Sequence, residues 1–292
     1  MILVTGASGL NGGVLVRKLS ARGIAVRALV RTAARAGDLA ALPYVEIAEA
    51  DMARPETLAA PLQGIERAML ISSADRGMVE VQTNFIEAAK KAGVRHVVKL
   101  SGIFPELDSP FRFARMHTEV EQRLAASGLA YTNLRAGEFM HSYFRQVPSI
   151  LSKGALFLPM ADARIASIDV DDIAEVAADV LTGPGHEGHN YPLTGPEALS
   201  MTEVAEKLSK VVGKPIRYVD VPPDDAKRAQ IAAGMPEFLA EGIAELFAER
   251  RKGKEGNVSA VIPTTFGRKP ISFDQFAARY AAVFRGEQPP PR

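Results

Sequence analysis

Cysteine and tryptophan are both absent from this chain of 292 residues. Without cysteine the chain has no disulfide, no thiolate nucleophile and no cysteine-ligated metal site, which fits a reducing cytoplasm. Long apolar runs are also missing, since none approaches the ~18 residues that a membrane-spanning helix needs. The first residues lack the pattern of a secretory signal peptide. We therefore expect a cytoplasmic protein that does not engage a membrane.

An excess of charge of one sign is lacking as well. The 35 basic and 34 acidic residues leave a formal net charge of +1, so no global field attracts the chain to nucleic acid. The basic run at residues 249–256 is too small a field for DNA or RNA and is expected to be a solvated loop. Hydrophobic residues make up 47%, as in ordinary globular proteins, and the length allows one large domain or two fused ones.

Strand-like and helix-like apolar patterns alternate along residues 1–136. This alternation indicates right-handed βαβ units and a parallel sheet with helices on its faces. The expected fold class is therefore α/β, a Rossmann-like doubly wound parallel sheet. Strands are predicted at residues 2–6, 25–31, 44–51, 67–73, 95–102 and 129–135, and helices at residues 9–23, 55–64, 78–93 and 111–128.

The alternation breaks after Arg135. We expect residues 1–136 to form a dinucleotide-binding Rossmann domain, to which residues 160–182 return. Residues 137–159 and 183–292 are then expected to form a smaller, mostly helical substrate-binding part.

Two helices of this second part have readable ends. Ser200, followed three residues later by Glu203, is typical of a capping box at the start of a helix. Residues 138–154 are predicted to form one or two helices, ended by Pro148 and Gly154.

No metal site is predicted. Asp169, Asp171 and Asp172 precede a helix pattern, where carboxylates cap the helix and favour its dipole. The histidines are scattered without the spacing of metal ligands.

A glycine-rich turn follows the first predicted strand. Its glycines have the spacing G-x-x-G-x-x-G and lead into a predicted helix, which is the setting of a nucleotide-binding turn. The first glycine permits the turn, the second lets the backbone approach a pyrophosphate, and the third allows close packing of helix on strand. A tight turn without a ligand is the alternative. The cofactor contacts predicted here are Gly6, Ser8, Gly9, Leu10, Asn11 and Gly12.

The end of the second strand indicates which dinucleotide is bound. NAD-binding proteins place an acidic residue there to hold the ribose 2′-hydroxyl, yet no acid occurs from Val26 to Arg35. Arg31 and Arg35 instead suit a 2′-phosphate, which guanidinium groups can bind bidentately. We therefore favour NADP(H) over NAD(H), with two merely solvated arginines as the alternative.

Two further strand ends supply cofactor candidates. Asp51 could accept a hydrogen bond from adenine while Met52 packs on the ring, although Asp51 could equally cap the next helix. Ser72, Ser73 and Ala74 follow the fourth strand, where small residues leave room for ribose and pyrophosphate.

Taken together, these residues resemble the NmrA-like group of atypical short-chain dehydrogenase/reductases. That group includes triphenylmethane reductase-like enzymes, NAD(P)H:quinone oxidoreductases, phenylpropanoid reductases and the redox-sensing regulator NmrA. The resemblance extends over nearly the whole chain and implies cofactor contacts at Lys99 and Gly137. The matching stretches are VTGASGLNGG, ALVR, VVKLSG, HTEVEQRLAASGLAYTNLRAGEFM, SIDVDDIAEVAADVL and GRKPISFDQFAARYAAVF.

The chain departs from ordinary short-chain dehydrogenases at the catalytic pair. Those enzymes use Tyr-x-x-x-Lys, but none of the six tyrosines here is followed by lysine at that spacing. Phe113 stands where the tyrosine would be and His117 where the lysine would be, while Ser101 matches the serine at the end of the fifth strand. His117 and Ser101 are therefore the catalytic candidates. His117 could bind the cofactor, supply a proton near its ordinary pKa of roughly 6.5, or be purely structural.

The resemblance implies an NAD(P)H-dependent oxidoreductase. We favour direct hydride transfer from NADPH to a flat apolar electrophile such as a quinone, a conjugated carbonyl or a dye, with a non-catalytic redox sensor that acts through a protein partner as the alternative. The oligomeric state, monomer or homodimer, stays open. A predicted helix within residues 234–249 could cover the substrate with Phe238, Ile243, Leu246 and Phe247. The substrate contacts expected from the family pattern are Phe104, Phe113, Phe139, Met140 and Tyr143.

Overall fold

The computed structural model describes residues 1–291 and divides them into two compact units. Unit 1 consists of residues 1–109, 113–136 and 170–192. Unit 2 consists of residues 110–112, 137–169 and the chain from Leu193 on. The segment that returns to unit 1 is thus 170–192, where the sequence suggested 160–182. The roles assigned to the two parts stay predictions.

Unit 1 is built on a sheet that confirms the predicted α/β class. Its seven strands within residues 1–291 have the order β3-β2-β1-β4-β5-β6-β9. All five registered pairs between β3 and β6 are parallel. The order reverses between β1 and β4, and such a switch point opens a crevice at the carboxyl ends of the strands. The strands are β1 (Ile2–Val4), β2 (Val26–Val30), β3 (Val45–Glu49), β4 (Arg67–Leu70), β5 (His96–Gly102), β6 (Ala130–Ala136) and β9 (His189–Leu193).

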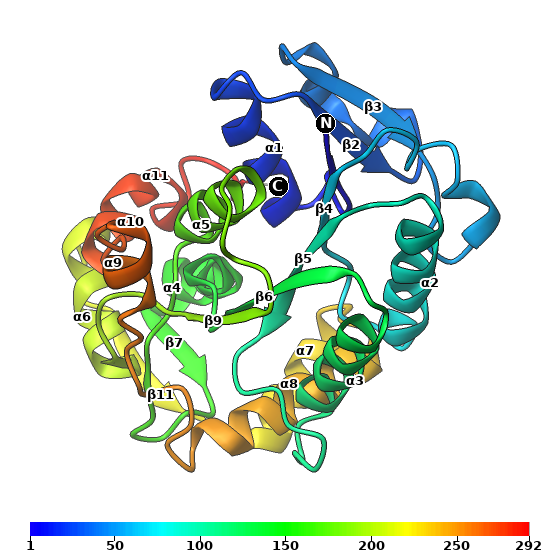
Figure 1. Cartoon of the computed structure of the whole chain (residues 1–292). Coiled ribbons are helices and arrows are strands. Elements are labelled where there is room, and N and C mark those ends of the chain that lie inside the picture. The colour runs from blue at the N-terminus through cyan, green and yellow to red at the C-terminus, as the bar shows by residue number, and fades with distance from the viewer. Residues whose placement is uncertain (292) are drawn as a thin grey trace. The chain divides into compact units, whose positions relative to one another are not determined.

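Helices cover both faces of this sheet (Figure 1). Helices α1 (Leu10–Ala21) and α5 (Val170–Thr182) pack on each other on one face, and α2 (Met78–Lys91) and α3 (Arg112–Ala126) cover the other. The core beneath α2 and α3 contains fully buried residues such as Phe85. Between α1 and α5, the Lys18 ammonium lies 2.9 Å from the Asp171 carboxylate and 3.0 Å from that of Glu175.

One predicted helix of unit 1 is wrong. Residues 55–64 contain only a short 3₁₀ turn, Pro55–Thr57. Pro61 explains the difference, because its missing N–H and its ring interrupt a helix interior. Two further 3₁₀ turns, Ala33–Arg35 and Gly37–Ala41, follow β2.

Unit 2 is mostly helical and contains two small sheets. Strand β7 (Ala155–Leu158) pairs in parallel with β11 (Arg217–Asp220), and β8 (Arg164–Ile165) pairs antiparallel with β10 (Leu199–Ser200). The helices are the 3₁₀ helix η4 (Met140–Gln146), α4 (Val147–Lys153), α6 (Met201–Val212), α7 (Pro223–Ala232), α8 (Glu237–Arg250), α9 (Val261–Phe266), α10 (Phe273–Arg279) and α11 (Ala281–Phe284).

The helix ends of unit 2 only partly follow the sequence signals. The capping box is confirmed: the Ser200 side chain accepts from the N–H of Glu203, and the Glu203 side chain accepts from the N–H of Ser200. Gly154 ends α4 in the left-handed conformation, as predicted. Pro148 does not end a helix, however, but lies in the first turn of α4, where its missing N–H costs no hydrogen bond.

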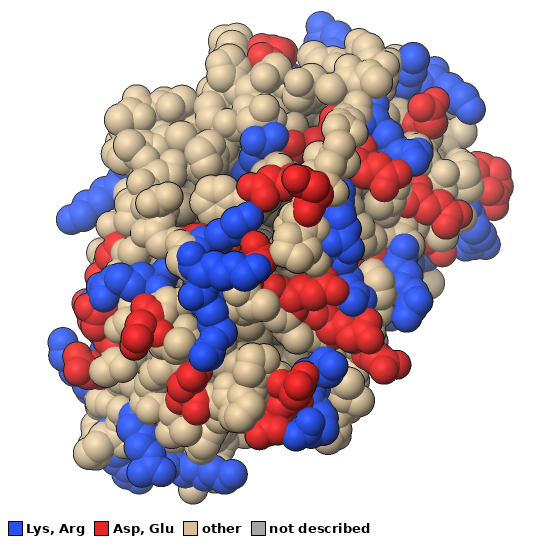
Figure 2. Space-filling model, turned by 90° about the horizontal axis from the view of Figure 1, so that it is seen from below, with Lys and Arg blue, Asp and Glu red and all other residues tan. Residues whose placement is uncertain are grey.

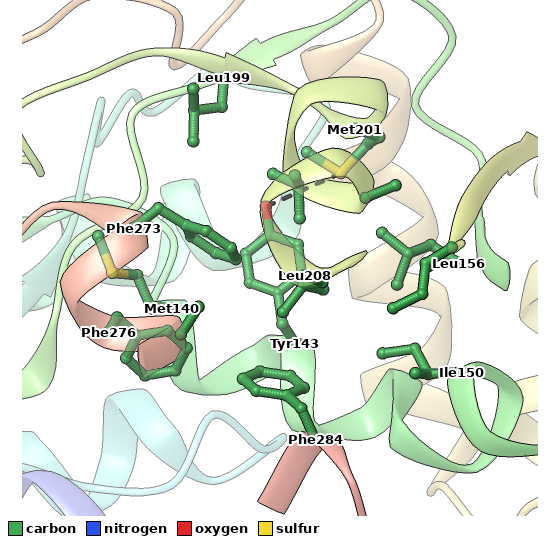
Figure 3. Close-up of a cluster of buried hydrophobic side chains, with 14 of the residues drawn as sticks. Met140, Tyr143, Ile150, Leu156, Leu199, Met201, Leu208, Phe273, Phe276 and Phe284 are labelled. Carbon is green, nitrogen blue, oxygen red and sulfur yellow. Dashed lines mark hydrogen bonds between the residues drawn. The ribbon is translucent and has the colours of Figure 1, made fainter. Parts of the chain in front are cut away.

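An aromatic cluster forms the core of unit 2 (Figure 3). Phe276 is fully buried and stacks on Phe144 with their ring centroids 5.5 Å apart. Tyr143 meets Phe273 edge to face at 5.3 Å, and its hydroxyl points to the sulfur of Met201. Side chains from η4, α6 and α10 therefore share one apolar interior.

The surface carries both signs of charge. On the face seen in Figure 2, Lys and Arg side chains alternate with Asp and Glu side chains. No helix within residues 1–291 combines the length and the apolar character needed to cross a membrane.

Candidate functional site

The glycine turn links the carboxyl end of β1 to α1. Gly6 has a φ of +60°, which glycine adopts without strain. A Cβ at Gly12 would lie 2.3 Å from the carbonyl oxygen of Gly6, so only glycine lets α1 start this close to the strand. The Thr5 hydroxyl donates to the carbonyl of Ile71 and accepts from its N–H, both at 2.7 Å. Thr5 thereby joins the ends of β1 and β4, a role that the sequence did not reveal.

A pocket of about 450 Å³ opens at this turn, and we call it the glycine-loop pocket. It lies at the carboxyl ends of β1 to β4, where doubly wound sheets bind ligands. The structure brings most of the predicted cofactor residues to its wall. Those lining it are Gly6, Ser8, Gly9, Leu10, Asn11, Gly12, Arg31, Arg35, Asp51, Met52, Ser72 and Ser73.

The start of α1 fits a bound pyrophosphate. The helix ladder begins with the N–H of Gly13, which donates to the carbonyl of Gly9, so the preceding N–H groups are without intrahelical partners. The first turn carries no acidic residue. The Oδ1 of Asn11, which is buried beside the pocket, has no hydrogen-bond partner within residues 1–291. The N–H groups without partners and the positive end of the helix suit an anion. The buried Oδ1 of Asn11 can accept a hydrogen bond, so it suits a ligand that also offers a hydroxyl.

Arg31 and Arg35 are exposed at the edge of the pocket. Neither guanidinium has an ion pair or a side-chain hydrogen bond within the described residues. Glu49, at the end of β3, accepts from the N–H of Ala33 at 2.5 Å and so is engaged with backbone. Both arginines are therefore available for a phosphate.

Asp51 keeps both of the roles that the sequence allowed. Its Oδ1 accepts from the N–H of Ala53 at 3.0 Å, which caps the turn, and the residue also lines the pocket. Nearby, the buried Gln82 donates to the hydroxyl of Ser72 at 2.8 Å and fixes that wall of the pocket. Gln82 carries no motif, so nothing in the sequence identified it.

Three predicted cofactor residues lie outside the pocket wall. Ala74 is exposed but does not line it. The N–H of Gly137, in unit 2, donates to the carbonyl of Leu193 at 3.0 Å. Lys99 is fully buried on β5.

The two catalytic candidates lie between β5 and α3. The ammonium of Lys99 lies 2.8 Å from Nδ1 of His117, and the hydroxyl of Ser101 donates to Glu121 at 2.6 Å. Glu121 also receives two hydrogen bonds from Arg135. Lys99 and Ser101 are two residues apart on β5, so they point to the same face of the sheet. His117 and Glu121 are four residues apart on α3, so they lie on the same face of that helix and meet the two strand residues.

Burial controls the ionisation of the first pair. It lowers the pKa of Lys99 to about 7, with Arg135 acting in the same direction and Glu121 opposing it. Burial and the charge of Lys99 lower the pKa of His117 well below its usual value. A histidine that supplies a proton near pH 6.5 is therefore wrong for this site, and Lys99 is the group of the pair that titrates near neutrality.

The predicted substrate residues separate into different surroundings. In unit 1, Phe104 is half-buried with a φ of +53°, and Phe113 is buried. In unit 2, Phe139 is half-buried and forms a bridge with Ile168. Met140 belongs to the aromatic core at 1% exposure.

Tyr143 lines a second pocket, of about 780 Å³, which lies entirely within unit 2 and which we call the unit 2 pocket. Helix α8 contributes Ile243, Leu246 and Phe247 to its wall, whereas Phe238 is not among the lining residues; that they cover a substrate stays a prediction. Met160 and Met201 add a flexible apolar surface that the sequence did not identify.

Comparison with known proteins places this geometry in a family. A model described as the NmrA-like family matches residues 1–276. The NAD(P)H azoreductase of Xenophilus azovorans is 39% identical over 284 residues, covering 97% of this chain and 99% of that protein. The structure of the Escherichia coli NADPH-dependent quinone oxidoreductase QOR2 in complex with NADPH superposes with a TM-score of 0.87 at 32% identity, over 96% of this chain and 99% of that one. Triphenylmethane reductase of Citrobacter sp. in complex with NADP(H) gives 0.83 at 26% identity, over 96% and 100%.

The glycine turn can be tested with two glycine-to-alanine substitutions that differ in the room available for the added Cβ. Gly12→Ala should destabilise the chain and abolish binding of a nicotinamide dinucleotide, because its Cβ would collide with the backbone of Gly6. Gly9→Ala should fold normally, because its Cβ would lie 3.4 Å from the oxygen of Gly6, and should weaken NADPH binding by narrowing the pocket. Thermal melting and NADPH fluorescence titration measure the two effects. Equal melting temperatures for the two variants would contradict this assignment.

The lowered pKa of Lys99 predicts how the free energy of unfolding changes with pH. Its pKa is about 7 in the fold but 10.5 when unfolded, so the unfolded chain binds more protons between these values and stability rises with pH there. One such proton corresponds to a slope of about 1.4 kcal/mol per pH unit in the free energy of unfolding. Lys99→Met should remove this slope between pH 7.5 and 9.5, by roughly that amount. Urea unfolding at several pH values measures it, with exposed Lys90→Met as the control; equal slopes in all three proteins would contradict the lowered pKa.

Proposed function

Since the chain belongs to the NmrA-like family and is a reductase, we propose that it transfers a hydride from NADPH directly to a flat apolar acceptor. The acceptor in this reaction would be a quinone, a conjugated carbonyl compound or a dye. The observation that carries the proposal is the glycine-loop pocket, in which a free helix start and two unpaired arginines converge at a switch point of the sheet.

The choice of NADPH rests on charge. Arg31 and Arg35 would hold the 2′-phosphate, and Gly9, Asn11 and the start of α1 would hold the pyrophosphate. No acidic residue stands between Val26 and Arg35 to select the free hydroxyl of NADH. The relatives named above are an NAD(P)H enzyme and two proteins solved with NADPH or NADP(H), which supports a nicotinamide dinucleotide.

The bound nicotinamide would supply the hydride, so the residues of the chain need only orient the acceptor. Neither catalytic candidate is placed as a strong acid, because His117 is neutral at pH 7 and the hydroxyl of Ser101 is bonded to Glu121. An acceptor whose reduced anion is delocalised does not need such an acid, since water can protonate it. Proximity and orientation then provide the rate enhancement.

His117 has a defined tautomer when Lys99 is charged. The ammonium donates to Nδ1, so Nε2 carries the proton and is a hydrogen-bond donor. Gly102 permits this placement, because a Cβ there would lie 3.0 Å from Cδ2 of the imidazole. We assign to His117 the binding of the cofactor through Nε2–H, with Lys99 as its positioning residue.

The first test is turnover and cofactor preference. The wild-type protein should oxidise NADPH with at least one neutral quinone or dye, and NADPH should bind more tightly than NADH. Arg31→Asp should weaken NADPH ten- to hundredfold, about 1.4–2.7 kcal/mol, because a carboxylate repels the 2′-phosphate. NADH binding should not weaken. Lys90→Asp, an equal charge change on α2 away from the pocket, should leave both affinities unchanged.

Two results would reject parts of this proposal. Tight NADPH binding without turnover on any acceptor would identify a redox sensor instead of this reaction. An unchanged NADPH affinity in Arg31→Asp would show that this arginine is only solvated.

The second test separates binding from chemistry at His117. His117→Ala should raise the dissociation constant of NADPH and leave single-turnover hydride transfer at saturating NADPH nearly unchanged, because the imidazole donates a hydrogen bond but no proton. Titration and stopped-flow absorbance give the two quantities. A loss in the hydride-transfer step alone would make His117 part of the chemistry.

A further inference from the structure

The unit 2 pocket has an apolar wall and few free polar groups. Its volume of about 780 Å³ is in the range of pockets that hold drug-sized ligands. Aromatic, aliphatic and methionine side chains make up most of the wall, including Phe157, Leu158, Met160, Ile243 and Phe247. Such a surface suits a flat ring system.

Most of the charged side chains at this pocket are already paired. Glu138 receives hydrogen bonds from Ser142 and from Arg250. Arg250, 4% exposed, also lies 2.7 Å from the carboxylate of Glu255, whose pKa is raised by burial. The two carboxylates and the guanidinium of this cluster are thus bonded to one another, and Glu138 and Arg250 bring the cluster to the pocket wall.

The other acidic residue of the wall is paired as well. Asp225 forms an ion pair with Arg228, one turn further along α7. Arg228 does not itself line the pocket.

Arg145 is different. It is exposed, lines the pocket from η4, and forms no ion pair or side-chain hydrogen bond within residues 1–291. A second unused group lies on α7, where the buried Oε1 of Gln230 has no hydrogen-bond partner in the same part of the chain. The pocket therefore presents one free cation and one free acceptor beside an apolar surface.

We propose that the unit 2 pocket binds an aromatic acceptor carrying one anionic group, a carboxylate or sulfonate, which Arg145 recognises. Gln230 accepts from an N–H or O–H on the same ring system. The inference rests on the proposed function, because it names the acceptor class of that reaction. It predicts that anionic quinones and dyes bind better than their neutral counterparts.

The test uses two non-reducible fluorescent probes, anilinonaphthalene sulfonate and phenylnaphthylamine. They share one ring system and one N–H group, and they differ in the sulfonate. The sulfonate should bind about fivefold more tightly than the neutral probe, the size of a partly exposed charge-assisted contact. Arg145→Gln should abolish this preference and leave the neutral probe unaffected.

Two variants serve as controls. Arg217→Gln removes an exposed arginine of β11 that does not line the pocket and should keep the preference. Ala229→Trp adds an indole at an exposed lining position and should weaken both probes. NADPH affinity, measured on the same samples, should not change in any of the three variants.

The outcomes separate this inference from the proposed function. Equal binding of the two probes to the wild type, or a preference that survives Arg145→Gln, would overturn the inference even if NADPH reduces neutral quinones. Absence of turnover with every acceptor would overturn the proposed reaction, while a preference that depends on Arg145 would still establish the anion site.

Discussion

The contact between Gly12 and the backbone of Gly6 is the constraint on which the glycine-loop pocket depends. Because a Cβ would lie 2.3 Å from the carbonyl oxygen of Gly6, α1 can begin at the sheet edge only with glycine in this position. The close approach places the unpaired N–H groups of α1 at the end of β1. Thr5 then ties β1 to β4 through Ile71, so the strand ends that line the pocket hold fixed positions.

The features predicted from the sequence are the ones whose partners are close along the chain. The glycine turn and the capping box of Ser200 and Glu203 have spacings that local backbone geometry imposes. The arginines after β2 were found by the same reasoning, because a strand end predicts where they lie. Strand β7 was missed because its four apolar residues show no alternation, and its partner β11 lies far along the chain.

The sequence did not reveal the contacts between α3 and the strands β5 and β6 that set the ionisation of the candidate residues. The position of His117 on its helix was predicted, but its ionisation depends on Lys99, which approaches from β5. Glu121 stabilises the charged form of Lys99 from a distance while bonding Ser101 and Arg135 directly. The lowered pKa of each member of the pair is thus a property of tertiary packing. These pKa shifts cannot be predicted from the composition of the chain or from the spacing of its residues.

Arg145 and Gln230 line the unit 2 pocket. Their role in the proposed reaction follows from the absence of a strong catalytic acid among the candidate residues. Where a strong catalytic acid is present, it can also select the substrate, because only a group that it can protonate reacts. Without one, hydride transfer depends on how the acceptor is held. Glu138, Arg250 and Glu255 are bonded to one another, so their charged groups are already engaged. In the proposed reaction, selection among flat acceptors would therefore fall to Arg145 and Gln230, whose interactions within the described residues are incomplete.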